Sequence, residues 1–177
     1  MKGLRSIPRI LKINQIDGRT MSLLFNNGYS LNVNIEDVLT DGKPVKKGGL
    51  VDQILSNDKV FNSAVIIGNS IGWPGIGKHV KDFSGNSTFY PYDVDPLLLY
   101  NAGELDEKEN MNLGDRIRKL RKSIGITQAE LASRVGTTKN YISKLENNKS
   151  DVELLTLKKI VEAGLNGKLS LSIDIPA

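Results

Sequence analysis

Residues 126–149, ITQAELASRVGTTKNYISKLENNK, carry the most specific pattern in the chain. Thr127 is a natural N-cap, because its hydroxyl can accept a hydrogen bond from a backbone N–H of the first helical turn. Glu130 stands three residues later, where its side chain can bond back to the N-cap backbone in a capping box. These two residues predict a helix that begins at Gln128 and runs to Val135.

A second helix is predicted over 138–147, directly after the first. Gly136 permits the left-handed backbone that turns the chain between the two helices, and Ala132 is small where they must cross. Ile142 and Leu145 lie three residues apart on one face and anchor the second helix to a core. The outer face carries polar side chains, which are Lys139, Asn140, Ser143 and Lys144.

The polar face of the second helix has the chemistry of a major-groove reader. Asn can pair with N6 and N7 of adenine and Lys can donate to O6 and N7 of guanine, and each good pair contributes about 1–3 kcal/mol of base discrimination. Thr138 can contact a phosphate or a thymine methyl group. Tyr141 leaves two interpretations open, packing against the helix or contact with the DNA backbone. Gln128 begins a helix whose free N–H groups attract a phosphate.

The apolar residues from Leu113 onward recur at helical spacing. Gly125, Gly136 and Gly164 are predicted to end helices. The apolar stripes are Ile117, Leu120 and Ile124, then Leu131 and Val135, then Ile142 and Leu145, then Leu154, Leu157, Ile160 and Val161.

Residues 111–165 resemble the helix-turn-helix of the lambdoid phage repressors and the Xre family. The resemblance implies an internal salt bridge between Arg121 and Glu146, which ties the first helix to the third. It also implies two sets of DNA contacts. Thr138, Lys139, Asn140 and Lys144 fall at base-contacting positions, with Ser143 on the same face, and Thr127, Gln128, Asn147 and Lys149 fall at phosphate-contacting positions, with Tyr141 as a further candidate.

After Gly164 the chain departs from the five helices of that family. Leu169, Leu171, Ile173 and Ile175 alternate with polar residues, which predicts a strand with one apolar face that needs a partner. LNGKLSLSIDI is similar to the β-tail of several Xre-type antitoxins, which pairs with its counterpart across a dimer. This resemblance implies a homodimer whose two recognition helices lie about 34 Å apart, one turn of B-DNA.

Basic residues outnumber acidic residues only in the C-terminal part. Residues 1–110 carry 12 basic and 13 acidic side chains, whereas residues 111–177 carry 12 and 7. A basic segment attracts polyanions, so nucleic acid and anionic membrane are the candidate partners. Because the helix-turn-helix pattern lies in the same segment, we predict double-stranded DNA as the partner.

The first part of the chain alternates β-like runs with turn signals such as Asp17-Gly18, which predicts an antiparallel meander. Asp95 and Pro96 predict the capped start of a final helix. Strands are predicted over 9–16, 21–25, 29–35, 64–67 and 70–73, and short helices over 36–39 and 52–61.

Residues 101–112 are polar and acidic and show no apolar period, which indicates a connecting segment. We therefore predict an α+β protein with two domains. An antiparallel-sheet α+β domain covers 1–103, a linker covers 104–112, and an all-α, lambda-repressor-like helix-turn-helix domain with a C-terminal strand covers 113–177.

Residues 9–103 resemble a domain-of-unknown-function family, number 2442, through LLFNNGYSLNV, Phe61, Ile71-Gly72-Trp73-Pro74 and DVDPLLLY. That family occurs beside bacterial toxin genes and is sometimes fused to helix-turn-helix domains. Residues 75–92 exceed its usual loop length. Two hypotheses follow: an autoregulatory repressor of antitoxin type with a toxin protein as partner, or a sensor that binds a small molecule near Trp73 and modulates DNA affinity.

Several classes of site lack the residues they need. The chain has no cysteine and a single histidine, His79, which argues against disulfides and against a thiolate or His-based metal site. No apolar run reaches the roughly 18–20 residues of a membrane span, and MKGLRSIPRI lacks the apolar run of a secretory signal. We expect a cytoplasmic protein without metal, cofactor or membrane partner.

Two patterns suggest catalysis at first sight. Residues 72–78 match the first seven positions of a P-loop, but His79 stands where a magnesium-binding Ser or Thr is needed. Asp93 and Asp95 pair two carboxylates, which we interpret as helix capping before Pro96. No Ser, His and Asp arrangement has a spacing typical of nucleophilic catalysis, so we predict no catalytic residue and no enzyme activity.

Overall fold

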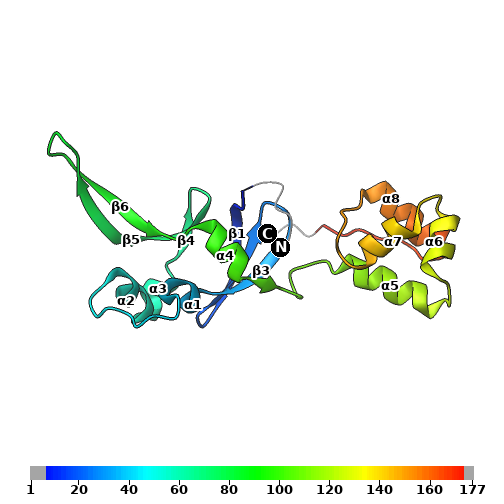
Figure 1. The fold of residues 1–177 in the computed structure, drawn as a ribbon, viewed down its shortest axis with the longest axis horizontal. Coiled ribbons are helices and arrows are strands. Elements are labelled where there is room, and N and C mark those ends of the chain that lie inside the picture. The colour runs from blue at the N-terminus through cyan, green and yellow to red at the C-terminus, as the bar shows by residue number, and fades with distance from the viewer. Residues whose placement is uncertain (1–6, 174–177) are drawn as a thin grey trace. The chain divides into compact units, whose positions relative to one another are not determined.

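The protein has an α+β fold, which confirms the predicted class (Figure 1). The computed structural model describes residues 7–173. The chain divides into two compact units, residues 1–110 and residues 111–177. We call them the N-terminal unit and the helical unit, and each is described by itself.

An antiparallel meander forms the first sheet of the N-terminal unit, with strand order β1-β2-β3-β7. The predicted turns join its first three strands, where Gly18 and Gly28 adopt positive φ angles of 56° and 81°. Met21, Leu23 and Phe25 alternate along β2 and are fully buried, so one face of the sheet packs on the core. The strands are β1 (Ile10–Asp17), β2 (Thr20–Phe25), β3 (Ser30–Asn34) and β7 (Glu104–Leu105).

The short strand β7 corrects the predicted linker over 104–112. It pairs with Leu31 and Asn32 of β3, so the chain extends the sheet where its composition indicated a connection. A strand of two residues is too short to produce an apolar period, which is why the sequence pattern missed it.

Asp106 holds the segment after β7 against the sheet. Its carboxylate accepts a hydrogen bond from the buried Ser22 hydroxyl at 2.6 Å and from the backbone N–H groups of Lys108 and Glu109 at 3.0 and 3.3 Å. Burial raises the pKa of Asp106, but the hydrogen bonds lower it by more, so its pKa lies below the ordinary value. The buried carboxylate is therefore ionised and well solvated by protein donors.

A long hairpin dominates the second sheet, which has strand order β4-β5-β6. The sequence predicted a strand over 70–73 followed by a loop over 75–92, whereas the strand continues to Lys81 and the next one begins at Ser87. Residues 72–78 lie in extended backbone within β5, so they form no phosphate-binding loop in front of a helix. The strands are β4 (Val65–Ile67), β5 (Ser70–Lys81) and β6 (Ser87–Asp93).

Short helices complete the N-terminal unit. The Asp95 carboxylate accepts a hydrogen bond from the Leu97 N–H at 2.8 Å, and Pro96 occupies the first turn, as the capping interpretation predicted. The helices are α1 (Ile35–Thr40), α2 (Leu50–Leu55), α3 (Asp58–Phe61) and α4 (Pro96–Ala102).

Trp73 lies at the centre of the N-terminal core. Its side chain is fully buried, and its indole N–H donates to the Phe61 carbonyl oxygen at 3.0 Å. The rings of Phe61 and Tyr92 each lie 6.2 Å from it, centroid to centroid. The sensor hypothesis expected a ligand near Trp73, but this residue is packed on all sides and has its polar atom satisfied.

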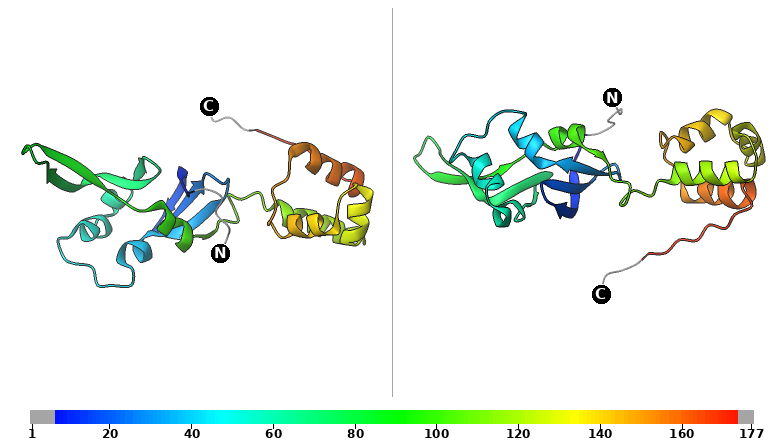
Figure 2. Two further views of the ribbon diagram at one scale, coloured as in Figure 1. Left: turned by 45° about the horizontal axis from the view of Figure 1, so that its top comes forward. Right: turned by 90° about the horizontal axis from the view of Figure 1, so that it is seen from below.

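The helical unit packs its helices around a second core, as Figure 2 shows from two sides. Most of the predicted apolar stripes face this core, but Ile124 and Leu154 are 40% and 53% exposed. Within residues 7–173, none of the helices is long and apolar enough to span a bilayer. The helices are α5 (Leu113–Ser123), α6 (Gln128–Arg134), α7 (Lys139–Glu146) and α8 (Leu154–Lys159), which runs on into the π-helical turn η1 (Ile160–Gly164).

Gly164 differs from the other glycines predicted to end helices. Gly125 and Gly136 have positive φ angles of 73° and 65°, as a left-handed stop requires. Gly164 does not, and a Cβ atom there would lie 2.6 Å from Leu131 Cδ1 and 2.7 Å from Val135 Cγ1. Glycine is therefore required at this position because η1 approaches α6 too closely for a Cβ atom.

The C-terminal tail forms no strand within residues 168–173 of the single chain, and the predicted strand, which needs a second copy as its partner, stays a prediction. Leu169 is half-buried against the helical core, whereas Leu171 and Ile173 are 63% and 78% exposed. The predicted Ile175 lies outside the described residues. A strand requires backbone hydrogen bonds to a neighbouring strand, and residues 168–173 pair with none of the strands in residues 7–173.

Candidate nucleic-acid interface

Helix α7 presents the polar face that the sequence predicted. Thr138 caps it, because its hydroxyl oxygen accepts a hydrogen bond from the Tyr141 N–H at 3.1 Å. Ile142 and Leu145 are buried at 0% and 2% exposure and fix the inner side of the helix. On the outer side, Lys139, Asn140 and Lys144 are exposed and Ser143 is half-buried.

Tyr141 lies on the border between the two sides of α7. Its side chain is half-buried and packs against the helical core. Burial raises the pKa of the Tyr141 hydroxyl, and the negative charge of Glu153 raises it further. Of the two interpretations left open by the sequence, the structure favours packing.

Helix α6 begins with a complete capping box. The Thr127 hydroxyl oxygen accepts from the Glu130 N–H at 3.1 Å, and the Glu130 carboxylate accepts from the Thr127 N–H at 2.6 Å. The hydrogen bonds from Thr127 lower the pKa of Glu130, so the carboxylate is ionised at neutral pH. This box fixes where α6 begins and therefore where the turn before α7 falls.

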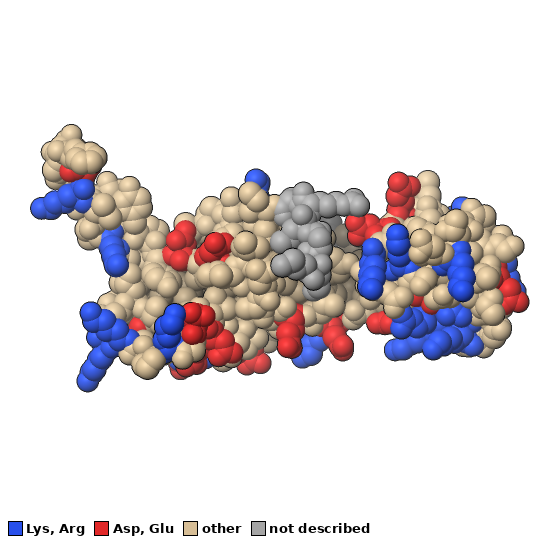
Figure 3. Space-filling view, viewed as in Figure 1, with Lys and Arg blue, Asp and Glu red and all other residues tan. Residues whose placement is uncertain are grey.

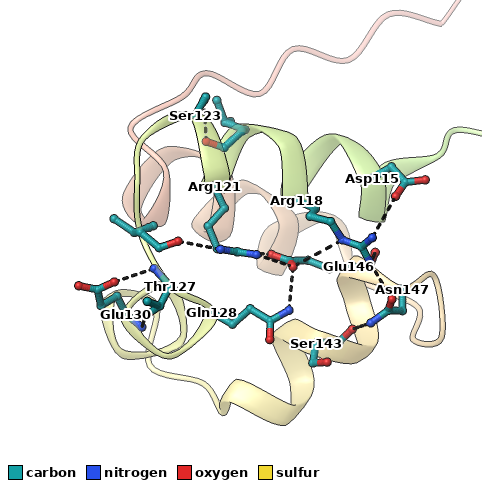
Figure 4. Close-up of polar contacts among 12 residues, drawn as sticks. Asp115, Arg118, Arg121, Ser123, Thr127, Gln128, Glu130, Ser143, Glu146 and Asn147 are labelled. Carbon is teal, nitrogen blue, oxygen red and sulfur yellow. Dashed lines mark hydrogen bonds and ion pairs between the residues drawn. The ribbon is translucent and has the colours of Figure 1, made fainter.

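Glu146 connects three helices from a fully buried position (Figure 4). Arg121 of α5 donates to its two carboxylate oxygens, with Nε at 2.5 Å and a terminal nitrogen at 2.9 Å. Gln128 of α6 donates to the same carboxylate at 2.8 Å. A paired Arg fork is the strong geometry for a carboxylate, so this cluster locks α7 against both neighbouring helices.

The charge on Glu146 is stabilised by its donors. Burial raises its pKa, but the hydrogen bonds from Arg121 and Gln128, with the positive charges of Arg121 and Arg118, lower the pKa by more. The net result is a pKa below the ordinary value for glutamate. Correspondingly, the hydrogen bond to Glu146 raises the pKa of Arg121 above its ordinary value.

Arg118 belongs to the same cluster, although the sequence analysis did not single it out. One terminal nitrogen donates to the Glu146 carbonyl oxygen at 2.8 Å and to the Asn147 side-chain oxygen at 2.6 Å. These bonds cover the end of α7, where backbone carbonyls lack helical partners. The available signal was its position three residues before Arg121, on the same face of α5.

Gly114 is a second residue that the sequence analysis missed. Its N–H donates to the Asn148 side-chain oxygen at 3.0 Å. A Cβ atom at Gly114 would lie 2.3 Å from the Leu145 carbonyl oxygen, so only glycine permits α5 to approach the end of α7 this closely. In the sequence, the only indication of this role was a glycine in the first turn of the helix, within Leu113-Gly114-Asp115.

The residues predicted to contact phosphate differ in how many hydrogen bonds their side chains already form within the protein. Gln128 donates to Glu146, and Asn147 donates to the Ser143 carbonyl oxygen at 2.7 Å and accepts from Arg118. The Thr127 hydroxyl is a cap acceptor and keeps its own proton to donate. Lys149 is exposed just beyond α7 and has its backbone held by the Lys144 carbonyl oxygen at 2.8 Å.

The helical unit also carries exposed positive charge on α5. In Figure 3, Lys and Arg side chains gather over α5. The exposed basic residues of α5 are Arg116, Lys119 and Lys122. Among residues 7–173, no group of His, Cys, Asp and Glu side chains has the arrangement of a metal site.

A match to a family model agrees with this geometry. Residues 117–163 match the model of a helix-turn-helix family, and this match supports a DNA-binding regulator. In a search of solved structures, the chain is similar to the crystal structure of a candidate DNA-binding protein from Nitrosomonas europaea, with 12% identity, a TM-score of 0.34 and coverage of 96% of each chain.

Replacing Arg121 with Met should destabilise the helical unit by about 3–5 kcal/mol, because Glu146 would be left buried without its main partner. The double variant Arg121→Met/Glu146→Leu should recover most of that loss, since it removes both charges. Urea unfolding followed by far-ultraviolet circular dichroism measures the effect on the helices. Trp73, the only tryptophan, reports the N-terminal unit separately and should show an unchanged transition. A double variant as unstable as the single one would contradict the pairing.

The wild-type helical unit should lose stability in acid more steeply than the double variant. The pKa of Glu146 is lowered in the folded state, so its ionised form contributes stability that is fully present above the unfolded pKa, about 4.3. That contribution is lost as the pH falls below this value through the folded pKa. The difference in unfolding free energy between the two proteins should be constant from about pH 7 to 5 and change below about pH 4. Parallel curves down to about pH 3 would show that Glu146 is not held ionised.

Proposed function

We propose that the protein is a sequence-specific DNA-binding transcriptional regulator that reads base edges with α7. The observation that carries the proposal is the exposed polar face of α7, formed by Lys139, Asn140 and Lys144, on a helix locked from behind by Glu146. A two-residue or three-residue set of this chemistry is sufficient to discriminate bases in a major groove. The helix-turn-helix match over residues 117–163 supports the same function.

The buried cluster around Glu146 explains how a short helix can be a precise reader. Side chains that read DNA must be held in position by contacts that do not themselves involve DNA. Arg121, Arg118 and Gln128 supply those contacts to α7 from the two helices beside it. In this proposal Gln128 acts through Glu146, and Lys149 provides a direct phosphate contact.

We propose further that the regulator binds an inverted repeat as a homodimer and represses transcription. The exposed Leu171 and Ile173 support pairing between the tails of two copies, because two apolar side chains on one edge gain burial when a second strand covers them. Such a dimer places two recognition helices on half-sites about 10 base pairs apart. Bound over its own promoter, it would exclude RNA polymerase. The toxin partner and the resemblance of residues 9–103 to family 2442 stay predictions.

Changing Asn140 or Lys144 to Ala should relax base preference at particular positions, by about 1–3 kcal/mol for each base pairing removed. Changing Lys149 to Ala should weaken all duplexes alike and reduce the slope of log affinity against log salt by about 1. Selection of bound sequences from random duplexes with purified full-length protein measures the first effect, and salt titration of a selected duplex measures the second.

Lys158→Ala is the matched control for these variants, because Lys158 of α8 pairs weakly with Glu162 of η1 at 3.9 Å and lies outside the proposed interface. Its base preference and salt slope should equal those of the wild type. If Asn140→Ala and Lys149→Ala changed binding in the same way, the assignment of base and phosphate roles would be wrong. Selection of no sequence at all by the wild type would overturn the proposed function.

Deleting residues 170–177 should convert the dimer into a monomer and leave the fold of the helical unit intact, because Leu169, which packs against the helical core, is retained. Gly167, whose N–H donates to the Val161 carbonyl oxygen at 2.9 Å, remains to close η1. Sedimentation velocity measures the oligomeric state, and circular dichroism checks the fold. The point variant Leu171→Asp/Ile173→Asp should have the same effect, while Ser170→Asp should not. A dimer that persists in both variants would reject the tail as the interface.

A further inference from the structure

The hairpin formed by β5 and β6 projects from the N-terminal unit (Figures 1 and 2). Its tip is closed by the Asp82 carboxylate, which accepts hydrogen bonds from the Ser84 and Asn86 N–H groups at 2.8 and 2.9 Å. Phe83 at the tip is fully exposed. The base of the hairpin supplies Ile71 and Trp73 to the core, whereas its exposed aromatic tip contributes nothing to that core.

The register of the hairpin separates its side chains into two faces. Lys78 lies directly opposite Tyr90, and Tyr92 follows two residues later on the same face. The other face carries His79, whose ring lies 5.2 Å from the Phe89 ring. Lys78 and His79 of β5 therefore each lie opposite an aromatic residue of β6.

The face of Lys78 and Tyr92 borders an open cavity of about 580 Å³. The other wall of this cavity is the loop from α1 to α2, which contains Lys43, Lys46 and Lys47. Four lysines thus line the cavity, and its lining includes no carboxylate. In Figure 3, Lys and Arg side chains lie at this end of the N-terminal unit, with Asp and Glu side chains beside some of them.

Three carboxylates close in sequence to these lysines are engaged in other contacts or offset only one charge, while burial and the negative charge of Asp93 raise the pKa of the lining residue Tyr92. Asp41 pairs with Lys43 at 2.8 Å, and Asp52 accepts from the Gly48 N–H at 2.7 Å. Asp82 is occupied at the hairpin tip, and its hydrogen bonds lower its pKa. The remaining lysines of the cavity, Lys46, Lys47 and Lys78, are exposed and form no ion pair within residues 7–173.

We propose that this lysine-lined cavity and the adjoining hairpin form a second DNA-contacting surface, which binds the phosphate backbone of duplex DNA. The proposal rests on the proposed function, since a protein bound to DNA through α7 has the DNA phosphates as a nearby polyanion. Lysines act as point charges toward phosphates, and phosphate contacts hold a protein on a duplex without reading sequence. A two-stranded ribbon also has the width that a major groove admits.

The surface adds affinity that does not depend on sequence. Each lysine that neutralises a phosphate releases a counterion and steepens the salt dependence of binding. Base preference belongs to α7 and is unaffected by the second surface. The full-length protein therefore has a steeper salt dependence than its helix-turn-helix contacts alone provide.

The test uses the full-length triple variant Lys46→Ala/Lys47→Ala/Lys78→Ala. Its slope of log affinity against log salt on a selected duplex should fall by about 1 for each phosphate that is no longer neutralised, up to about 3 in all. Its base preference should remain that of the wild type. Fluorescence of Trp73 and circular dichroism should be unchanged, because all three lysines are exposed.

A charge-matched triple, Lys12→Ala/Lys59→Ala/Lys108→Ala, controls for net charge within the same unit, and its slope should equal that of the wild type. Equal slopes for the cavity triple and the wild type would overturn the second surface and leave the proposed function standing, with a small anion or an acidic protein as the occupant of the cavity. Equal loss in both triples would also overturn it, because the effect would be one of net charge. Failure of the proposed function is recognised separately, by the absence of any base preference in the wild type.

Discussion

The buried carboxylate of Glu146 is the interaction on which the helical unit depends. An ionised group with no exposure to water is stable only when charged and polar donors surround it. Arg121, Arg118 and Gln128 come from two helices to meet this requirement, and they thereby fix the position of α7. The orientation of the polar face on α7 is consequently a result of buried electrostatics as much as of the apolar core.

The N-terminal unit supports the long hairpin formed by β5 and β6. Trp73 anchors the base of β5 in the core, and its indole N–H is bonded to Phe61. Beyond that anchor the strand leaves the core and its side chains become exposed. The hairpin therefore extends a packed sheet beyond the core, where Lys78, Lys81 and Phe83 are exposed.

Much of the helical unit was predictable because its signals are local. The capping box of Thr127 and Glu130 and the left-handed turn at Gly136 each involve residues three or four positions apart, and both are present. Because sequence signals are local, features that depend on contacts between distant residues were not predicted. Strand β7 depends on Asp106 meeting Ser22 across 84 positions, and the role of Gly114 depends on the Leu145 carbonyl oxygen. The local spacing of apolar residues gives no indication of such contacts.

By itself, the sequence determined the α+β class, the two helices of the DNA-reading motif and the residues on the outer face of α7. Those features follow from propensity and periodicity, which act within one or two turns of chain. Only the tertiary structure decided that Gln128 serves Glu146, that Gly164 is needed for close packing, and that Lys78 lies across a cavity from Lys46 and Lys47. These contacts join segments that are far apart in the sequence. Which segments come together depends on how the apolar faces of whole helices and strands are buried, and no single residue or local pattern determines it.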